Sequence, residues 1–315
     1  MPAYSASAPG KVILFGEHAV VYGRPAIAVP VLQVRAKALV SMNPRSPAGL
    51  VRLQAPDIGL DSTLADLPES HPLAAVLLKA AAAMKLNRIP ACSIKVTSTI
   101  PIAGGMGSGA AVSVAILRAF SASLGHPLSD EQVSQLSYEV ELIHHGTPSG
   151  IDNSVITYAK PVYFVKGKPI ETLQVKQPFS LVIGDTGVQS PTSSVVRDVH
   201  TAWEAAQAQF EALFDTAGKI AAAARKAIET GAVDALGPLM DENQALLRKM
   251  GVSSPELDRL IEAAHSSGAL GAKLSGAGRG GNMIALVTPD ISGRVARWLE
   301  DAGAVRTIVT EIPKT

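Results

Sequence analysis

The sequence has one cysteine, few aromatic residues and few charges. Because Cys92 is the only cysteine among 315 residues, the chain cannot form an internal disulfide. It lies in an alternating apolar stretch, CSIKVTSTI, which is typical of a buried structural thiol. Charged residues make up 17% of the chain and apolar residues 47%, a composition that excludes an intrinsically disordered protein. We expect a globular protein in a reducing compartment.

The sequence also lacks an excess of one charge and a long apolar run. Lys and Arg number 28 against 27 Asp and Glu, with no basic cluster, which excludes a typical nucleic-acid binder and favours a small-molecule partner. Lys79 or Arg118 interrupts the longest apolar stretches before they reach the ~18 residues of a membrane span. The first residues, MPAYSASAPGKV, do not resemble a signal peptide. We therefore expect a soluble, cytoplasmic protein without a membrane partner.

The length favours two domains, residues 1–176 and 177–315, each with an α+β or mixed α/β fold. In the first, KVILFG, AIAVPVLQVRAKALVSM, VRLQA and SIKVTSTI predict strands. Helices are predicted at residues 71–86, after the glycine-rich stretch at 103–107, and from Ser129-Asp130-Glu131 to about residue 146. The segment 152–173 predicts the strands of a hairpin.

The second half changes in character. After the strand FSLVIGD, residues 195–264 predict helices, with breaks at Gly218, Gly231 and residues 251–255. The chain then predicts strand, glycine loop, strand, helix and strand, at GAKLSG, SGAGRGG, NMIALV, ISGRVARWLEDAG and VRTIVTEI.

The stretch AGGMGSGAAVSVAILRAF, residues 103–120, begins with three glycines and continues as a helix. Glycines there let backbone N–H groups approach a ligand closely, and phosphate is the leading candidate. A Walker A loop is excluded because Ala110 and Ala111 follow in place of Lys and Ser or Thr. Gly105–Ala110 matches the dinucleotide fingerprint, but no acidic strand end follows about 20 residues later. The stretch predicts a phosphate loop without a Walker lysine, with a tight strand-to-helix turn as the alternative.

A second glycine-rich stretch, SGAGRGG at residues 275–281, precedes a strand and not a helix. It lets the backbone come close to a neighbour, which is either the same ligand or the other strand of a plain hairpin.

Two acids and a lysine stand out by position. Glu141 lies in the last turn of its predicted helix, where the dipole disfavours an acid by a few tenths of a kcal/mol, and a divalent cation would compensate. Asp152 follows a Pro/Gly loop that can aim a side chain, although a turn or cap is the alternative. Lys11 opens an apolar strand that leads to Glu17-His18, and the histidines show no zinc spacing. Together these are the groups that phosphoryl transfer needs.

Three motifs carry a family resemblance. PGKVILFGEHAVVYGRPAIAV, PIAGGMGSGAAVSVA and KLSGAGRGGNMIAL resemble, in order and spacing, the signature motifs of the GHMP kinases, and the first resembles mevalonate kinases in particular. The resemblance implies an α+β fold of two domains, an N-terminal α/β domain and a C-terminal ferredoxin-like domain with added helices. It also implies ATP and Mg²⁺ in the cleft between them, mevalonate as the small-molecule substrate, and 5-phosphomevalonate for isoprenoid synthesis as the product.

The resemblance further implies residue roles. Asp152 matches the catalytic aspartate, Lys11 the lysine that contacts the reacting hydroxyl, and Glu141 the Mg²⁺ ligand, with Ser108 as a second candidate ligand. The implied nucleotide-binding residues are Gly104, Gly105, Met106, Gly107, Ser108, Gly109 and Ala110. The implied substrate-binding residues are Glu17, His18, Ser149, Gly150, Thr192, Gly276, Ala277 and Gly278.

The chain departs from the family pattern at two positions. Gly109 stands where the family commonly has a second serine, often a Mg²⁺ ligand, so that Ser108 or water has to take its place. Ser190 stands where a basic residue often precedes the threonine matched by Thr192, which puts the affinity for substrate in question.

Other functions remain open at this point. Another GHMP kinase, for phosphomevalonate, homoserine or a sugar, would share the ATP site. A noncatalytic sensor on the same fold is disfavoured by Asp152 and Lys11, and a dinucleotide oxidoreductase rests only on the fingerprint match. The sequence does not determine the oligomeric state, and a homodimer is an open alternative to a monomer.

Overall fold

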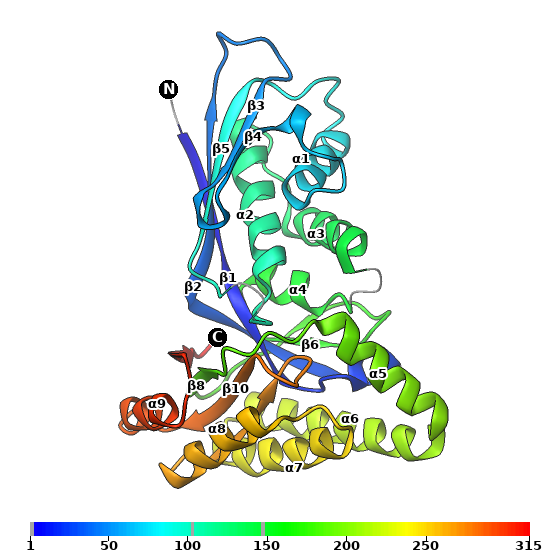
Figure 1. Cartoon of the computed structure of the whole chain (residues 1–315), viewed down its shortest axis with the longest axis vertical. Helices are drawn as coiled ribbons and strands as arrows, with labels where there is room; N and C mark the ends of the chain where they lie inside the picture. Colours follow the sequence, from blue (N-terminus) through cyan, green and yellow to red (C-terminus); the bar gives the residue numbers. More distant parts are fainter. Residues whose placement is uncertain (1–2, 102–103, 146–148) are drawn as a thin grey trace. The chain divides into compact units, whose positions relative to one another are not determined.

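The computed structural model describes residues 3–101, 104–145 and 149–315 (Figure 1). This part of the chain forms two compact units, each assembled from separate segments. The first takes the chain up to Gly10, residues 34–101 and residues 107–159; the second takes residues 11–33, the segment that ends at Met106, and residues 160–315. The long strands β1 (Ala3–Phe15) and β2 (Ala26–Met42) therefore contribute to both units.

The first unit contains a mixed sheet in the order β4-β3-β5-β2, with β1 paired to β2. Its further strands are β3 (Val51–Ala55), β4 (Leu60–Thr63) and β5 (Cys92–Ser98). β5 runs antiparallel to β2, with Ala36 opposite Ser98, and parallel to β3, with Val51 opposite Cys92. Cys92 is buried, as its alternating apolar neighbours predict.

The helices of the first unit lie beside this sheet (Figure 1). They are α1 (Pro72–Ala83), α2 (Ser108–Ser123), α3 (Asp130–His145) and α4 (Ile151–Tyr158), with the 3₁₀ turns η2 (Pro56–Ile58) and η3 (Leu64–Asp66). The predicted start of α3 is confirmed by a capping box, in which Ser129 N donates to Gln132 Oε1 (3.0 Å) and Gln132 N to Ser129 Oγ (3.3 Å). α2 contacts α1, α3, α4 and β5, which explains its apolar sequence.

The prediction of hairpin strands from residue 152 is wrong at its start, because residues 151–158 form α4. Ser154 Oγ donates to Gly150 O, four residues earlier, at 2.7 Å, a contact that helical backbone allows and extended backbone does not. Only β6 (Val162–Phe164) and β7 (Glu171–Thr172) form the predicted hairpin, and β6 also pairs with β2 in the second unit.

The second unit also contains a four-stranded sheet in the order β11-β8-β10-β9, antiparallel throughout. Its strands are β8 (Phe179–Asp185), β9 (Gly271–Ser275), β10 (Asn282–Val287) and β11 (Arg306–Ile312), close to the predicted ranges. The helices are α5 (Thr192–Ala205), α6 (Gln207–Thr230), α7 (Leu236–Lys249), α8 (Pro255–Ser266) and α9 (Ser292–Asp301). The unit also has the 3₁₀ turns η1 (Ala19–Tyr22) and η4 (Val233–Ala235).

The predicted helix break at Gly218 is wrong, since α6 runs through this residue and the break lies at Ala206. A Cβ at Gly218 would come within 3.2 Å of Arg24 Cγ and 3.3 Å of Pro25 Cδ. The glycine therefore makes room for a neighbouring segment and does not end the helix.

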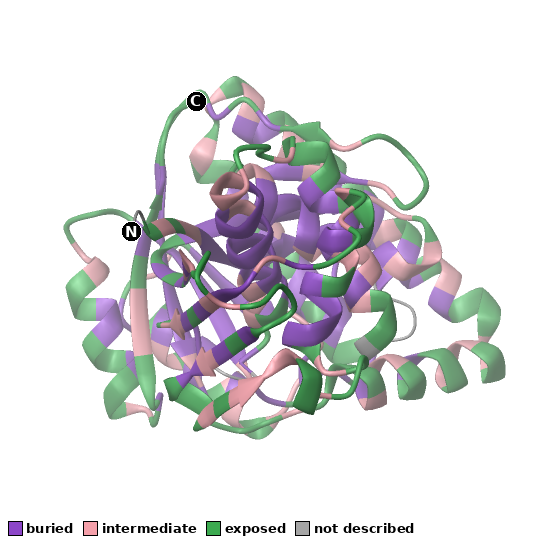
Figure 2. Ribbon diagram, turned by 90° about the horizontal axis from the view of Figure 1, so that it is seen from above, coloured by how far each residue is buried: buried purple, intermediate pink, exposed green. Residues whose placement is uncertain are grey.

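Buried residues line the strands and the inward faces of the helices, while turns and outer helix faces are exposed (Figure 2). Across residues 3–101, 104–145 and 149–315, no helix has the length and apolar character needed to cross a membrane.

Candidate active site

The second unit brings Lys11, the start of the glycine loop and the third motif together. Lys11 lies in β1 and is buried, and its backbone N donates to Met106 O at 3.0 Å. Asn282, the first residue of β10, donates through Nδ2 to Gly104 O. Three segments that are far apart in the sequence thus meet at the residues predicted to act on substrate and nucleotide.

Further hydrogen bonds join the first motif to the third. Ile13 N donates to Ser275 Oγ (3.0 Å), and that hydroxyl donates to Ile13 O (2.9 Å). His18 Nε2 lies 2.9 Å from Ala277 O. Burial lowers the pKa of His18 to about 4, so the ring is neutral at pH 7. Because a carbonyl only accepts, Nε2 carries the ring proton and Nδ1 is left as an acceptor.

Glu17 forms a buried ion pair with Lys273. Lys273 Nζ in β9 donates to Glu17 Oε1 and, at 2.6 Å, to its neighbour Leu274 O. The Lys273 side chain is fully buried and that of Glu17 is 1% exposed. Burial raises the pKa of Glu17, while the Lys273 ammonium acts in the opposite direction. Burial likewise lowers the pKa of Lys273, while the Glu17 carboxylate acts in the opposite direction.

The turn that follows His18 is anchored on α6. The Tyr22 ring stacks on Phe214, with centroids 4.2 Å apart. Arg24 Nε donates to Asp215 Oδ1 at 3.0 Å, and its Nη2 pairs with Glu211. These contacts fix the chain immediately after Glu17 and His18.

The third motif forms a tight loop between β9 and β10. Gly278 has φ +86°, and a Cβ there would lie 2.1 Å from Val252 O, so close backbone packing requires this glycine. Gly276 has φ +98°, but its Cβ position is open. Gly281 N donates to Val188 O (2.9 Å), which ties the loop to the segment before Thr192, the exposed first residue of α5. The predicted substrate-binding roles of Gly276, Gly278 and Thr192 stay predictions.

In the first unit the glycine loop continues into α2, as the sequence predicts. Gly107 is the N-cap in the left-handed conformation, and Ala111 N donates to its carbonyl at 2.9 Å. The N–H groups of Ser108, Gly109 and Ala110 precede this first helical bond and point toward the positive end of the helix dipole. Such N–H groups can bind phosphate oxygens. Ala103, the first residue of the predicted loop, lies outside the described residues.

The two candidate acids of the first unit lie on packed helices. Glu141 is in the last turn of α3, and Asp152 is in the first turn of α4, whose N-cap is Gly150 at φ 89°. Asn153 Nδ2 donates to Ser134 Oγ at 2.9 Å, which holds α4 against α3. Ser149 Oγ accepts from Ile151 N (3.4 Å), so Ser149 and Gly150 form the entry to α4. This arrangement fixes the backbone on both sides of Asp152.

Several residues at the site were not predicted from the sequence. Lys273 and Asn282 contact predicted site residues, and Arg279 has φ 57° within the third loop and bonds to Asp198 Oδ2 at 2.5 Å. A lysine inside the apolar strand GAKLSG was a usable signal, because a buried ammonium requires an acidic partner.

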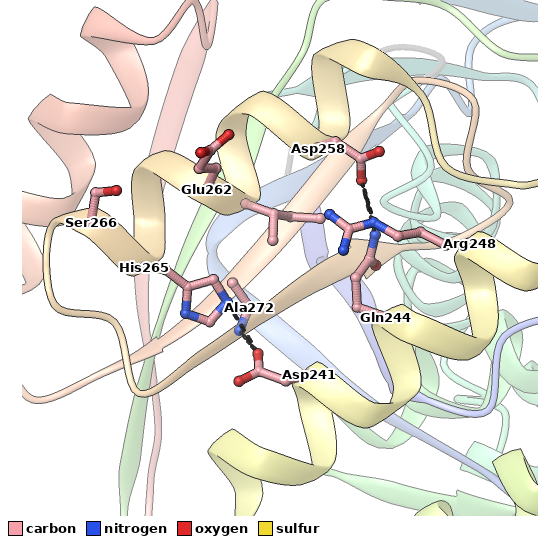
Figure 3. A pocket seen from close by; sticks show the side chains of 9 residues that line it. Asp241, Gln244, Arg248, Asp258, Glu262, His265, Ser266 and Ala272 are labelled. Atoms are coloured by element: carbon pink, nitrogen blue, oxygen red, sulfur yellow. Dashed lines mark hydrogen bonds and ion pairs between the residues drawn. The ribbon is translucent and has the colours of Figure 1, made fainter.

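A pocket of about 320 Å³ lies between α7 and α8 in the second unit (Figure 3). His265 Nε2 is 3.2 Å from Asp241 Oδ1 across it, and Arg248 Nε donates to Asp258 Oδ1 at 2.9 Å. None of the residues predicted from the sequence as functional lines this pocket.

The comparisons with known proteins agree with these motifs. Residues 73–160 match the GHMP kinases N terminal domain and residues 224–305 match GHMP kinases C terminal, on either side of the predicted boundary at residue 176, which itself stays a prediction. The mevalonate kinase of Thermococcus gammatolerans is 35% identical over 98% of this chain and 96% of that protein. That of Aeropyrum pernix is 37% identical over 95% of this chain and 92% of its own length.

A solved structure extends the likeness to the fold. The crystal structure of L. major mevalonate kinase in complex with R-mevalonate matches with a TM-score of 0.84 and 30% identity, over 99% of this chain and 96% of that one. The two-domain α+β fold predicted from the sequence is confirmed by this likeness and by the family matches. The chain therefore belongs to the GHMP kinases and, within them, to the mevalonate kinase family.

Proposed function

We propose that the chain transfers the γ-phosphoryl group of ATP to the 5-hydroxyl of mevalonate, giving 5-phosphomevalonate and ADP for isoprenoid synthesis. The observation that carries the proposal is a network of hydrogen bonds in the second unit. In it Lys11 bonds to the glycine loop, and Glu17 and His18 bond to the third motif, which itself bonds to the glycine loop through Asn282. The names of the relatives and the mevalonate complex of the L. major enzyme support mevalonate as the acceptor.

In this mechanism Asp152 orients and deprotonates the acceptor hydroxyl, a contribution of about 10²–10⁴-fold. Lys11 stabilises the developing alkoxide. His18 presents Nδ1 as an acceptor for a substrate hydroxyl, since its other nitrogen is used by Ala277 O.

The N–H groups at the start of α2 would bind the phosphates of ATP, and Glu141 with Ser108 would hold Mg²⁺. In the described ranges, no set of three or more His, Cys, Asp or Glu side chains could hold a metal without other ligands. Mg²⁺ usually takes one or two carboxylates together with phosphates and water, so Glu141 and the loop hydroxyl suit it. When bound, the ion neutralises phosphate charge.

A coupled ADP-release screen over mevalonate, phosphomevalonate, homoserine and galactose tests the function. We expect mevalonate to have the highest kcat/KM, because the first motif follows the mevalonate kinase pattern through Gly23. Faster turnover of another acceptor would reassign the enzyme within the family. Binding of NAD in place of ATP would remove the kinase assignment altogether. The cytoplasmic location and the homodimer stay predictions.

A further inference from the structure

The ion pair between Glu17 and Lys273 is the most completely buried pair of charges that the structure describes. Its partners are 256 residues apart in the sequence, one after β1 and the other inside β9. Lys273 Nζ also donates to Leu274 O, so two acceptors are fixed around one ammonium group.

The pair is not needed to hold these two segments together. Ile13 and Ser275 already exchange two hydrogen bonds, and His18 bonds to Ala277 O. A buried ion pair is moreover a weak source of stability, since the cost of removing both charges from water offsets their attraction. A charged pair at this place therefore calls for a role other than joining β1 to β9.

The second carboxyl oxygen of Glu17, Oε2, indicates what this role is. Oε2 is buried, and among the described residues it has no hydrogen-bond partner. A buried carboxylate oxygen without a hydrogen-bond partner destabilises the protein, and the hydroxyl group of a bound alcohol can supply the missing donor.

We propose that Lys273 is a positioning residue for the acceptor: by holding Oε1 of Glu17 it fixes the orientation of this carboxyl group and leaves Oε2 to accept a hydrogen bond from a hydroxyl of the bound substrate. The inference rests on the proposed function. Without Lys273, Oε1 of Glu17 loses the donor that holds it, or burial favours the protonated acid. Either outcome withdraws a group from the acceptor and leaves the nucleotide site intact.

A double-mutant cycle tests this inference with Lys273→Met, Glu17→Gln and the variant that carries both. We expect Lys273→Met to lower kcat/KM for mevalonate by about 10- to 100-fold and to leave KM for ATP within about threefold. In the Glu17→Gln background the same change should alter kcat/KM by less than about twofold, because Lys273 acts through Glu17. The double variant should regain most of the lost Tm, since it buries no unpaired charge, but not the lost activity.

Arg52→Met is the control, because it removes an exposed Arg52–Asp61 pair (2.6 Å) between β3 and β4, strands that carry none of the predicted site residues. It should leave kcat/KM unchanged. Independent, additive effects of Lys273→Met and Glu17→Gln would overturn the inference, and so would recovery of activity together with Tm in the double variant. If Lys273→Met does not fold, Glu17→Gln and the double variant are compared, and a much less active double variant contradicts the inference. A wild-type protein inactive on mevalonate is a failure of the proposed function instead.

Discussion

At the scale of single residues, Asp152 is the side chain on which the proposed chemistry depends most. The sequence places it only after a Pro/Gly loop, whereas the structure places it in the first turn of α4. Asn153, its neighbour, is bonded to Ser134 of α3, so the backbone is fixed next to the acid. A catalytic group needs such support, because displacement of about 1 Å can cost about 10²-fold in rate.

Replacement of Asp152 by Asn should lower kcat by about 10²–10⁴-fold, or about 3–5 kcal/mol, because the proton acceptor is lost while the size is kept. ATP affinity and Tm should change little. Asp130→Asn is the control, since Asp130 also lies in the first turn of a helix but pairs with Arg118 at 2.6 Å. It should cost less than about 1 kcal/mol of stability and no activity. Steady-state kinetics with parallel ATP titrations measure both, and an Asp152→Asn enzyme with most of its turnover would exclude the acid from the mechanism.

At the scale of elements, α7 packs against β9 through backbone at two glycines. A Cβ at Gly237 would lie 2.1 Å from Leu270 O, and one at Gly271 would lie 2.3 Å from Gly237 O. β9 carries Lys273, so this close approach also places the lysine that pairs with Glu17. A helical glycine is thus used here for contact between elements, as Gly218 is in α6.

Gly237→Ala should destabilise the protein by about 3 kcal/mol, the upper part of the range for overpacked sites, because the atoms it would meet belong to the backbone. Gly293→Ala in α9 is the matched control, since its Cβ would meet nothing within 4 Å. That change should leave Tm unchanged or raise it slightly, as alanine favours helix over glycine by up to about 1 kcal/mol. Thermal melts followed by circular dichroism measure both variants. Equal melting temperatures for the two would mean that α7 and β9 do not approach this closely.

At the scale of the whole molecule, His18 links stability to pH. Its pKa is about 4 in the folded chain because of burial, against 6.5 for an ordinary histidine. Between these values the unfolded chain binds a proton that the folded chain does not, so stability falls as the pH falls from 6.5 to 4. Above pH 6.5 the histidine is neutral in both states, and its contribution is constant.

The free energy of unfolding should therefore fall by up to about 3 kcal/mol between pH 7 and pH 4 through His18 alone. His18→Asn should remove this part of the pH dependence, whatever its effect on stability at pH 7. His200→Asn, which changes an exposed histidine, should leave the pH dependence as it is in the wild type. Urea unfolding of the wild type and both variants at several pH values measures the pH dependence of the free energy of unfolding. The same pH dependence in the wild type and in His18→Asn would show that His18 does not control acid stability.

The sequence by itself determined the family, the glycine loop that leads into α2 and the start of α3, and it indicated Lys11, Glu141 and Asp152 as candidate site residues whose roles stay predictions. These features are local, because glycine content, capping residues and the order of short motifs depend on neighbours in the chain. Only the tertiary structure decided that residues 151–158 form a helix, that α6 continues through Gly218, and that Lys273 pairs with Glu17. Each of these depends on what packs against the segment from elsewhere, and an ion pair between residues 256 apart leaves no local pattern. For that reason Lys11 and Asp152 could be proposed from the sequence, whereas Lys273 inside its apolar strand indicated only that some acid must pair with it, and not that this acid is Glu17.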